Sequence, residues 1–386
     1  MAKQTAEFDI IVYGASGFTG RLVAEYLAKQ GVGKWAMAGR SLSKLVQVRD
    51  EMGLPSDTPL VVADASTPAS LVEMCNRTRV VLTTVGPYQL YGKELVAACA
   101  ETGTDYVDLC GEPAWMREMI DAHDARAKET GARIVFSCGF DSIPFDLGVW
   151  FLQQEANKRH GKPAPRVKGR VRKMQGGASG GTIASLTETM KAAAKNPKII
   201  GILKSSFGLT PGFEGPSQPS GLLPEYDSAT GTWTAPFVMA PINTKNVHRS
   251  NFLLGHPYGR DFVYDEMIMT TIGDAGRAMA EAIAKANPFG DAKILPGEGP
   301  SKEERENGFY DVLFIGEYPD GTSVRVSVSG DKDPGYGSTS KMIAESALTL
   351  LENDTPGGVT TPGAVMAAPL LARLEKNAGL TFLVEG

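Results

Sequence analysis

The first 150 residues alternate between short apolar runs and longer stretches with apolar residues at helical spacing. The apolar runs predict strands at 9–13, 35–38, 60–63, 80–84, 106–109 and 134–137, with helices between them at 20–30, 68–75, 93–102 and 115–130. Nearly continuous apolar strands are typical of a parallel sheet covered on both faces. This alternation predicts an α/β fold with a Rossmann-type, doubly wound parallel sheet.

After residue 150 the pattern becomes typical of antiparallel strands. Segment 166–174 alternates between apolar and charged residues, and segments 309–317 and 322–329 flank the turn sequence YPDG. Proline and glycine stand in that turn where a tight hairpin needs them. With helices expected at 181–195, 275–286 and 339–351, this part predicts a second α+β domain containing an antiparallel sheet.

The composition limits the classes of protein that this chain can belong to. It is 42% hydrophobic and 22% charged, as in ordinary globular proteins, and its net charge of −5 excludes nucleic acid as an expected partner. The four cysteines, Cys75, Cys99, Cys110 and Cys138, are widely spaced, which favours free thiols. No zinc-type histidine cluster, signal peptide or membrane-spanning run is evident, so we expect no metal and a cytoplasmic location.

The turn after the first predicted strand carries the motif GASGFTGR, with Gly14, Gly17 and Gly20 at GxxGxxG spacing. Gly14 permits a sharp turn, Gly17 lets a diphosphate approach the backbone, and Gly20 permits close packing of helix and strand. The following helix offers free N–H groups and a partial positive charge at its start. At the first strand–helix junction, this motif predicts a dinucleotide-binding site.

The second predicted strand is followed by Arg40 and Ser41. An acidic residue at this position commonly holds the ribose 2′-hydroxyl of NAD, whereas an arginine accommodates the 2′-phosphate of NADP. Arg40 therefore favours NADPH over NADH. Asp64 ends the third strand and is placed either to meet the adenine ring or to cap the next helix.

The fourth and sixth strands end in TTVGPYQLYG and CGFDSIPFD. Because ligands bind beyond the carboxyl ends of parallel strands, Val85, Gly86, Pro87 and Tyr88 are predicted to line the nicotinamide half of the site. Tyr88 is either a catalytic proton donor or a packing aromatic. Asp141 either acts in catalysis, by orienting the substrate or the nicotinamide amide, or caps a helix.

Together with GTDYVDLCGE and DPGYGSTSKMIAESAL, these motifs resemble the saccharopine dehydrogenase-like oxidoreductases, and most of all the mycobacterial trans-acting enoyl reductases. The resemblance covers nearly the whole chain. It implies NADPH-dependent reduction of an unsaturated acyl or polyketide thioester, with an acyl-carrier or polyketide synthase partner. The cofactor contacts that it carries over are Gly14, Ser16, Gly17, Phe18, Thr19, Gly20, Arg40, Ser41, Asp64, Gly86, Pro87 and Tyr88.

The resemblance also implies how the chain is divided. We expect a Rossmann domain at 1–150, an α+β substrate or dimerisation domain at 151–335, and a C-terminal helical segment at 336–386 that returns to the Rossmann domain. Residues 208–224 are rich in Gly and Pro, which predicts either a lid or a long surface loop. A homodimer is one option for the assembly.

Two departures from the family pattern change the picture. Cys110 stands where a hydroxyl residue is expected, so its role in the cleft is open. Segment 267–297 is interrupted by charge, which leaves at most a weak association with membranes.

Two other functions are compatible with the pattern. A saccharopine-reductase-like enzyme acting on a C–N (imine) bond would need cations for its substrate carboxylates, and Arg166, Lys168, Arg170 and Arg172 alternate along one strand. The same residues could instead form a solvated face or dock an acidic acyl-carrier. The remaining alternative is a non-catalytic scaffold that binds a cofactor or lipid.

Overall fold

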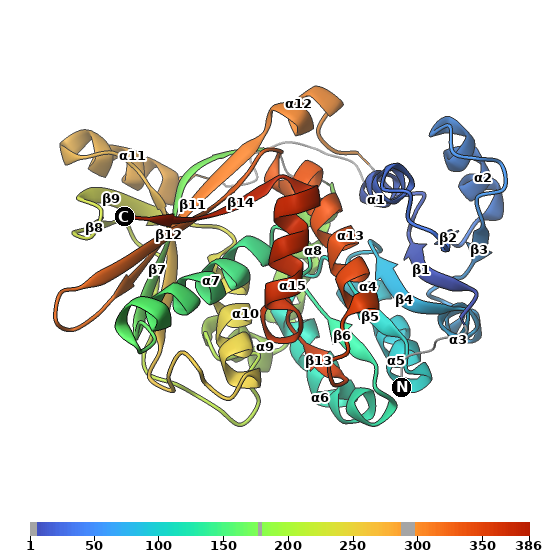
Figure 1. The fold of residues 1–386 in the computed structure, drawn as a ribbon, viewed down its shortest axis with the longest axis horizontal. Coiled ribbons are helices and arrows are strands. Elements are labelled where there is room, and N and C mark those ends of the chain that lie inside the picture. The colour runs from blue at the N-terminus through green and yellow to red at the C-terminus, as the bar shows by residue number, and fades with distance from the viewer. Residues whose placement is uncertain (1–5, 177–179, 287–297) are drawn as a thin grey trace.

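The computed structural model describes residues 6–176, 180–286 and 298–386, which form two sheets with helices packed around both (Figure 1). The first sheet is parallel throughout, with the order β13-β6-β5-β4-β1-β2-β3. Its strands are β1 (Phe8–Tyr13), β2 (Trp35–Gly39), β3 (Leu60–Val62), β4 (Thr78–Thr83), β5 (Asp105–Val107), β6 (Arg133–Val135) and β13 (Gly358–Thr360). All six predicted strands are present, and the Rossmann-type sheet is confirmed.

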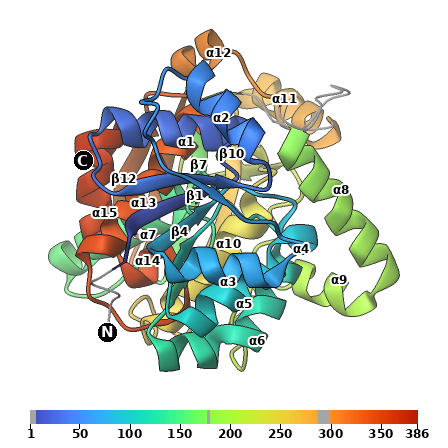
Figure 2. The same ribbon diagram turned by 90° about the vertical axis from the view of Figure 1, so that its right-hand side faces the viewer.

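Both faces of this sheet are buried because its strands are apolar on both sides. In β1, Ile10 and Val12 pack into one apolar cluster, whereas Ile11 and Tyr13 pack into the other. Helices cover the two faces (Figure 2). On one side lie α1 (Phe18–Lys29), α2 (Leu42–Glu51) and α13 (Thr339–Glu352), and on the other lie α3 (Pro68–Asn76), α5 (Lys93–Thr102) and α6 (Pro113–Thr130), with the short α4 (Tyr88–Tyr91) following β4.

The second sheet is mixed, with the order β14-β12-β11-β7-β10-β9-β8. Only its β7–β10 pairing is parallel among the described strands. The predicted hairpin is confirmed as β11 and β12, with Val312 opposite Val328. The strands are β7 (Arg166–Gln175), β8 (Glu225–Asp227), β9 (Thr232–Pro236), β10 (Val263–Met269), β11 (Phe309–Glu317), β12 (Ser323–Gly330) and β14 (Leu380–Glu385).

The helices of this half surround and connect the two sheets. The long α7 (Ile143–His160) joins the two sheets, and Gly148 on it lets the ring of Phe314 come close, since an added Cβ would lie 2.4 Å from that ring. One apolar cluster therefore extends from Ile10 of the first sheet to Phe314 of the second. The other helices are α8 (Gly180–Lys195), α9 (Pro197–Lys204), α10 (Ala240–Leu253), α11 (Gly273–Lys285) and α12 (Lys302–Asn307).

The C-terminal segment contributes to both sheets. The helical character predicted for 336–386 agrees with the structure. The segment contains helices α13, α14 (Pro362–Val365) and α15 (Ala367–Arg373), together with the short π-helices η1 (Pro334–Ser338) and η2 (Leu374–Ala378). The prediction omitted two strands, because β13 extends the first sheet beside β6 and β14 extends the second beside β12. The limits of the three domains stay predictions.

The charged strand β7 is buried by ion pairs, so the expectation of a solvated face or a docking patch is wrong for its central residue. The Arg170 side chain has no exposed surface; its guanidinium bonds to Asp227 at 2.6 Å and to Asp265 at 2.8 Å. The neighbouring cations are also paired: Arg166 with Asp265, Lys168 with Asp227 and Glu317, and Arg172 with Asp311 and Glu385.

Residues 208–224 contain no helix or strand, as predicted, and whether they form a lid stays a prediction. Among the described residues, no helix combines the length and the apolar character that crossing a membrane requires. The predicted charged interruption of 267–297 lies partly outside the described residues.

Candidate active site

The corner between β1 and α1 is closed by glycines. Gly14 has a φ of +89°, which favours glycine, and a Cβ on it would lie 2.7 Å from Val85. A Cβ on Gly20 would lie 2.2 Å from the carbonyl oxygen of Gly14. Gly17 precedes α1, is exposed, and no side chain caps the first turn. The corner therefore presents bare backbone and a helix start, which fits a dinucleotide diphosphate.

Three further predicted contacts lie in this loop or in the first turn of α1. Ser16, Phe18 and Thr19 are half-buried. The Phe18 ring packs edge-on against Tyr336 with centroids 5.2 Å apart, and the Arg305 guanidinium lies 5.4 Å from the centre of the same ring. The predicted cofactor loop therefore packs against η1 and α12.

The predicted adenosine end lies at the carboxyl edge of β2 and β3. Arg40 is exposed directly after β2, whereas the Ser41 hydroxyl caps α2 by accepting from the Lys44 amide at 3.3 Å. The Asp64 carboxylate accepts from the amide and hydroxyl of Ser66, both at 2.8 Å, and these bonds lower its pKa. Asp64 thus stabilises a local turn, and Thr67 is the residue that precedes α3.

The loop after β4 places the predicted nicotinamide contacts at the same edge. Gly86 is exposed and Val85 half-buried, but Pro87 is buried and Tyr88 is only 5% exposed. The Tyr88 hydroxyl donates to the Thr83 carbonyl at 3.4 Å and accepts from the Leu109 amide at 3.0 Å. Burial raises its pKa well above the usual range. This geometry favours the packing alternative for Tyr88 over the proton-donor one.

Glu112 is a structural determinant of this loop that the sequence analysis missed. Its buried carboxylate accepts from the backbone amides of Tyr88 and Gln89, each at 2.9 Å. It follows β5, so an acidic residue just beyond a strand end was the available signal. Glu112 fixes the backbone on which the predicted nicotinamide contacts stand.

Asp141 lies between β6 of the first sheet and α7, the helix that joins the two sheets; this junction is called the seam below. Its Oδ1 atom is fully buried without a hydrogen-bond partner among the described residues, and burial raises its pKa to about 7. No side chain caps α7, which begins two residues later. The structure thus does not support the helix-cap alternative, and the catalytic role of Asp141 stays a prediction.

A second carboxyl group, Glu266 on β10, lies near Asp141 and was also missed. It accepts from the Tyr264 hydroxyl and the Asn243 amide, each at 2.9 Å, and burial raises its pKa well above the usual range, with the charge of Asp141 contributing. Asn246 donates to the Ser142 hydroxyl at 2.8 Å. The Oδ1 atoms of both asparagines are buried without a partner in the described part of the chain.

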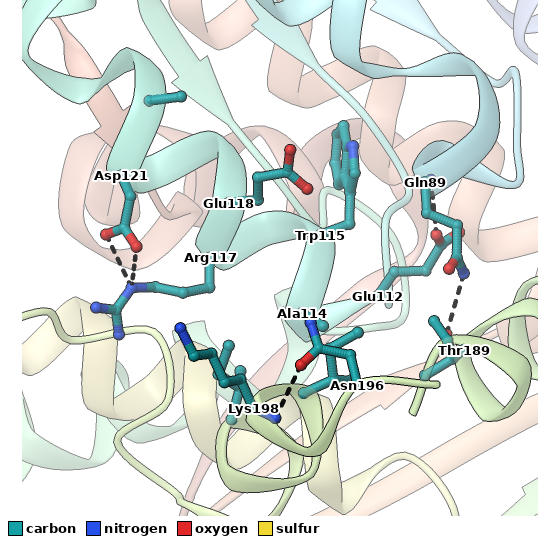
Figure 3. A pocket seen from close by; sticks show the side chains of 14 residues that line it. Gln89, Glu112, Ala114, Trp115, Arg117, Glu118, Asp121, Thr189, Asn196 and Lys198 are labelled. Carbon is teal, nitrogen blue, oxygen red and sulfur yellow. Dashed lines mark hydrogen bonds and ion pairs between the residues drawn. The ribbon is translucent and has the colours of Figure 1, made fainter. Parts of the chain in front are cut away.

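A cavity of about 680 Å³ opens at the same edge of the first sheet, between α6 on one side and α8 and α9 on the other (Figure 3). Gln89 and Glu112 lie at one end of it, and Trp115 and Ile202 belong to its walls. Its volume is in the range of small-molecule sites. The sequence did not assign α9 to a site.

A parallel sheet with a glycine-lined first corner, an exposed arginine after its second strand and polar groups at the seam defines a Rossmann-type dinucleotide-dependent oxidoreductase. Residues 10–135 match the saccharopine dehydrogenase NADP-binding domain family. The chain is 41% identical over 405 residues to a candidate trans-acting enoyl reductase of Mycobacterium tuberculosis, with 97% of each chain covered. It is 39% identical over 414 residues to the trans-acting enoyl reductase of Mycobacterium ulcerans, with 98% of each covered.

The chain therefore belongs to the saccharopine dehydrogenase-like oxidoreductases, in the family of the trans-acting enoyl reductases. It is an NAD(P)H-dependent oxidoreductase, and the matching domain family supports NADPH as the cofactor. Apo saccharopine dehydrogenase (L-Glu forming) from Saccharomyces cerevisiae shares the fold, with a TM-score of 0.55 at 13% identity over 98% of this chain and 100% of that one.

Proposed function

We propose that this protein uses NADPH to reduce the C=C bond of an α,β-unsaturated acyl or polyketide thioester. The observation that carries the proposal is that two features stand at the carboxyl edge of the same parallel sheet. These are the glycine corner, which suits the cofactor, and Asp141, a carboxyl group whose raised pKa of about 7 keeps much of it protonated near neutral pH. Relatives along the whole chain are named for this activity.

The reduction adds a hydride to the β carbon and a proton to the α carbon. NADPH supplies the hydride when it is bound. The amides at the start of α1 would hold its diphosphate, and Arg40 its 2′-phosphate. We assign the proton to Asp141, which becomes a carboxylate on transfer and is reprotonated from solvent. Glu266 and Asn243 are proposed to position the groups at this seam.

Reduction of an imine is the weaker alternative, because the cations that would hold substrate carboxylates are committed elsewhere. Arg166, Lys168, Arg170 and Arg172 all form ion pairs within the second sheet. An acyl thioester has no such carboxylates to neutralise. We propose that it arrives on an acyl-carrier or polyketide synthase partner, and that a homodimer is one form in which the enzyme meets it.

The test is NADPH oxidation with a panel of enoyl thioesters, beside a panel of 2-oxo acids with amines. We expect turnover on the first panel, a decline as pH rises through about 7, and a loss of at least about 100-fold in kcat for Asp141→Asn. Asp320→Asn, in an exposed turn, is the control and should retain activity. NADPH binding by calorimetry without turnover on either panel would favour the scaffold alternative.

A further inference from the structure

The cavity between α6 and the α8–α9 pair reaches the carboxyl edge of the first sheet. Gln89 follows β4 and Glu112 follows β5, so both stand at that edge. That edge is where ligands of such sheets bind. A ligand that fills the cavity as far as Gln89 would therefore have one end near the loop that precedes α4, although neither Val85 nor Gly86 lines the cavity.

Much of the polar lining of this cavity is already paired within the protein. The Arg117 guanidinium holds the Asp121 carboxylate at 2.8 Å, and the Gln89 amide donates to the Thr189 hydroxyl at 3.3 Å (Figure 3). The Glu112 carboxylate accepts from two backbone amides. These groups are already engaged within the protein, and the rest of the wall combines apolar residues with the charged side chains of Glu118 and Lys198.

The apolar part of the wall is incompletely covered. Helix α9 has the sequence PKIIGILK, yet none of its residues is buried. Ile199 and Ile202 line the cavity and are only half-buried, while Trp115 and Ala192 line it from α6 and α8. Covering such surface with an apolar ligand is favourable because the ligand removes it from water.

We infer that this cavity binds the hydrocarbon chain of the acyl substrate, with the thioester end beside the loop after β4. The inference rests on the proposed function. In this proposal the cavity selects the length of the acyl chain, and Asp141 donates the proton.

The first experiment measures binding without turnover. Palmitoyl-pantetheine and acetyl-pantetheine are saturated, so calorimetry in the presence of NADPH reports affinity alone. We expect the palmitoyl compound to bind at least about tenfold more tightly, since each buried methylene adds to the affinity. Ala192→Trp fills the cavity and should remove this difference. Ala194→Trp is the matched control, because Ala194 is exposed on the same helix and does not line the cavity.

A second pair of variants keeps the test valid if the tryptophan disturbs the fold, which would show as lost NADPH binding. Ile202→Asn places an amide in the cavity wall, whereas Ile200→Asn changes an isoleucine on the same helix that does not line the cavity. We expect palmitoyl-pantetheine to bind about tenfold more weakly to the first and equally well to the second.

The outcomes separate this inference from the proposed reductase activity. Equal binding of the two acyl compounds by the unaltered protein, or chain-length dependence that survives both cavity variants, overturns the inference even if enoyl thioesters are reduced. Chain-length-dependent binding that the cavity variants abolish, with no turnover of any enoyl thioester, supports the cavity and overturns the reductase.

Discussion

Strand β4 of the first sheet and strand β7 of the second are both interior strands, but they are buried by different means. β4 places Val80, Val81 and Leu82 against helices on both faces. β7 carries five cations, and Arg170 is buried as deeply as any valine because two carboxylates meet it. The centre of β4 is buried by apolar side chains, whereas Arg170 on β7 can be buried only because carboxylates balance its charge.

The two sheets therefore differ in where their polar and charged residues lie. In the first sheet, Arg40 and Asp141 stand at the carboxyl edge, whereas Arg133 and Asp105 form a buried ion pair where β6 and β5 begin. In the second sheet, Arg170 and its two carboxylate partners are enclosed in the interior. The first sheet thus leaves its edge to ligands, and the charges of the second stabilise the fold.

The largest effect is expected from breaking the buried ion pairs. Arg170→Ala removes the buried guanidinium that Asp227 and Asp265 share and leaves them only Lys168 and Arg166 as partners, and it should lower the free energy of unfolding by about 3–5 kcal/mol. Urea unfolding measures it. Arg277→Ala, at an exposed pair with Glu281 on α11, should change the same quantity by about 0.5 kcal/mol or less. Similar losses for the two variants would contradict the contrast between the sheets.

The second largest effect is expected from a substitution in the glycine corner between β1 and α1. Gly20→Ala forces a methyl group against the Gly14 carbonyl, and we expect a loss of about 1–3 kcal/mol in stability and at least about tenfold in NADPH affinity. Calorimetry and urea unfolding measure the two effects. Gly33→Ala is the control, since an added Cβ there would meet nothing within 4 Å. If Gly20→Ala leaves the NADPH affinity unchanged, the corner is not part of the cofactor site.

Protonation of Asp141 should make the free energy of unfolding depend on pH. Burial raises the pKa of Asp141 from its ordinary value of 3.8 to about 7, so the folded state holds a proton that the unfolded chain loses near pH 4. Its contribution to stability is therefore full below about pH 4 and is lost as pH rises through about 7.

Asp141→Asn removes this dependence. Relative to the unaltered protein, the variant should gain about 2 kcal/mol in the free energy of unfolding between about pH 4 and pH 8, after allowance for partial exposure. Urea unfolding across that range measures it. Asp320, whose pKa is lowered by the Thr322 hydroxyl, is the contrasting case, and Asp320→Asn should show no such gain. A difference that does not change with pH would show that Asp141 is not protonated in the folded protein.

The smallest effect concerns cofactor choice at the edge of the first sheet. Arg40→Ser should weaken NADPH binding about tenfold and leave NADH binding unchanged, because only NADPH has the 2′-phosphate. Arg49→Ser, at an arginine paired with Asp50 on α2, serves as the control. Equal weakening of both cofactors would indicate a general electrostatic effect and not recognition of the phosphate.

The first sheet could be predicted from the sequence because its signals are local. Apolar runs mark each of its first six strands, and the GASGFTGR corner follows the first directly. Helix α2 was missed although Leu45 and Val48 are buried on it and Ser41 caps it. Strand β13 was missed as well, since three residues far from the other strands carry too little pattern.

The second sheet and the seam were harder to predict because their signals are not local. Alternating cations predict a strand, but nothing in 166–174 indicates partners 57 and 95 residues away. Glu266 gave no signal, because burial of an acid depends on Tyr264 and Asn243, and Asn243 lies on another element. Asp141 was proposed from the sequence because it follows a strand end, whereas its buried oxygen without a hydrogen-bond partner is visible only in three dimensions.

Strands β13 and β14 follow every other described strand in the sequence, and this order has a consequence for folding during translation. Neither sheet reaches its full width until residues 358–385 have left the ribosome, because one of these strands completes each sheet. The parallel sheet therefore gains its last strand long after residues 8–135 have emerged. A nascent chain stalled before residue 358 would leave the edge of β6 and the edge of β12 without their neighbouring strands.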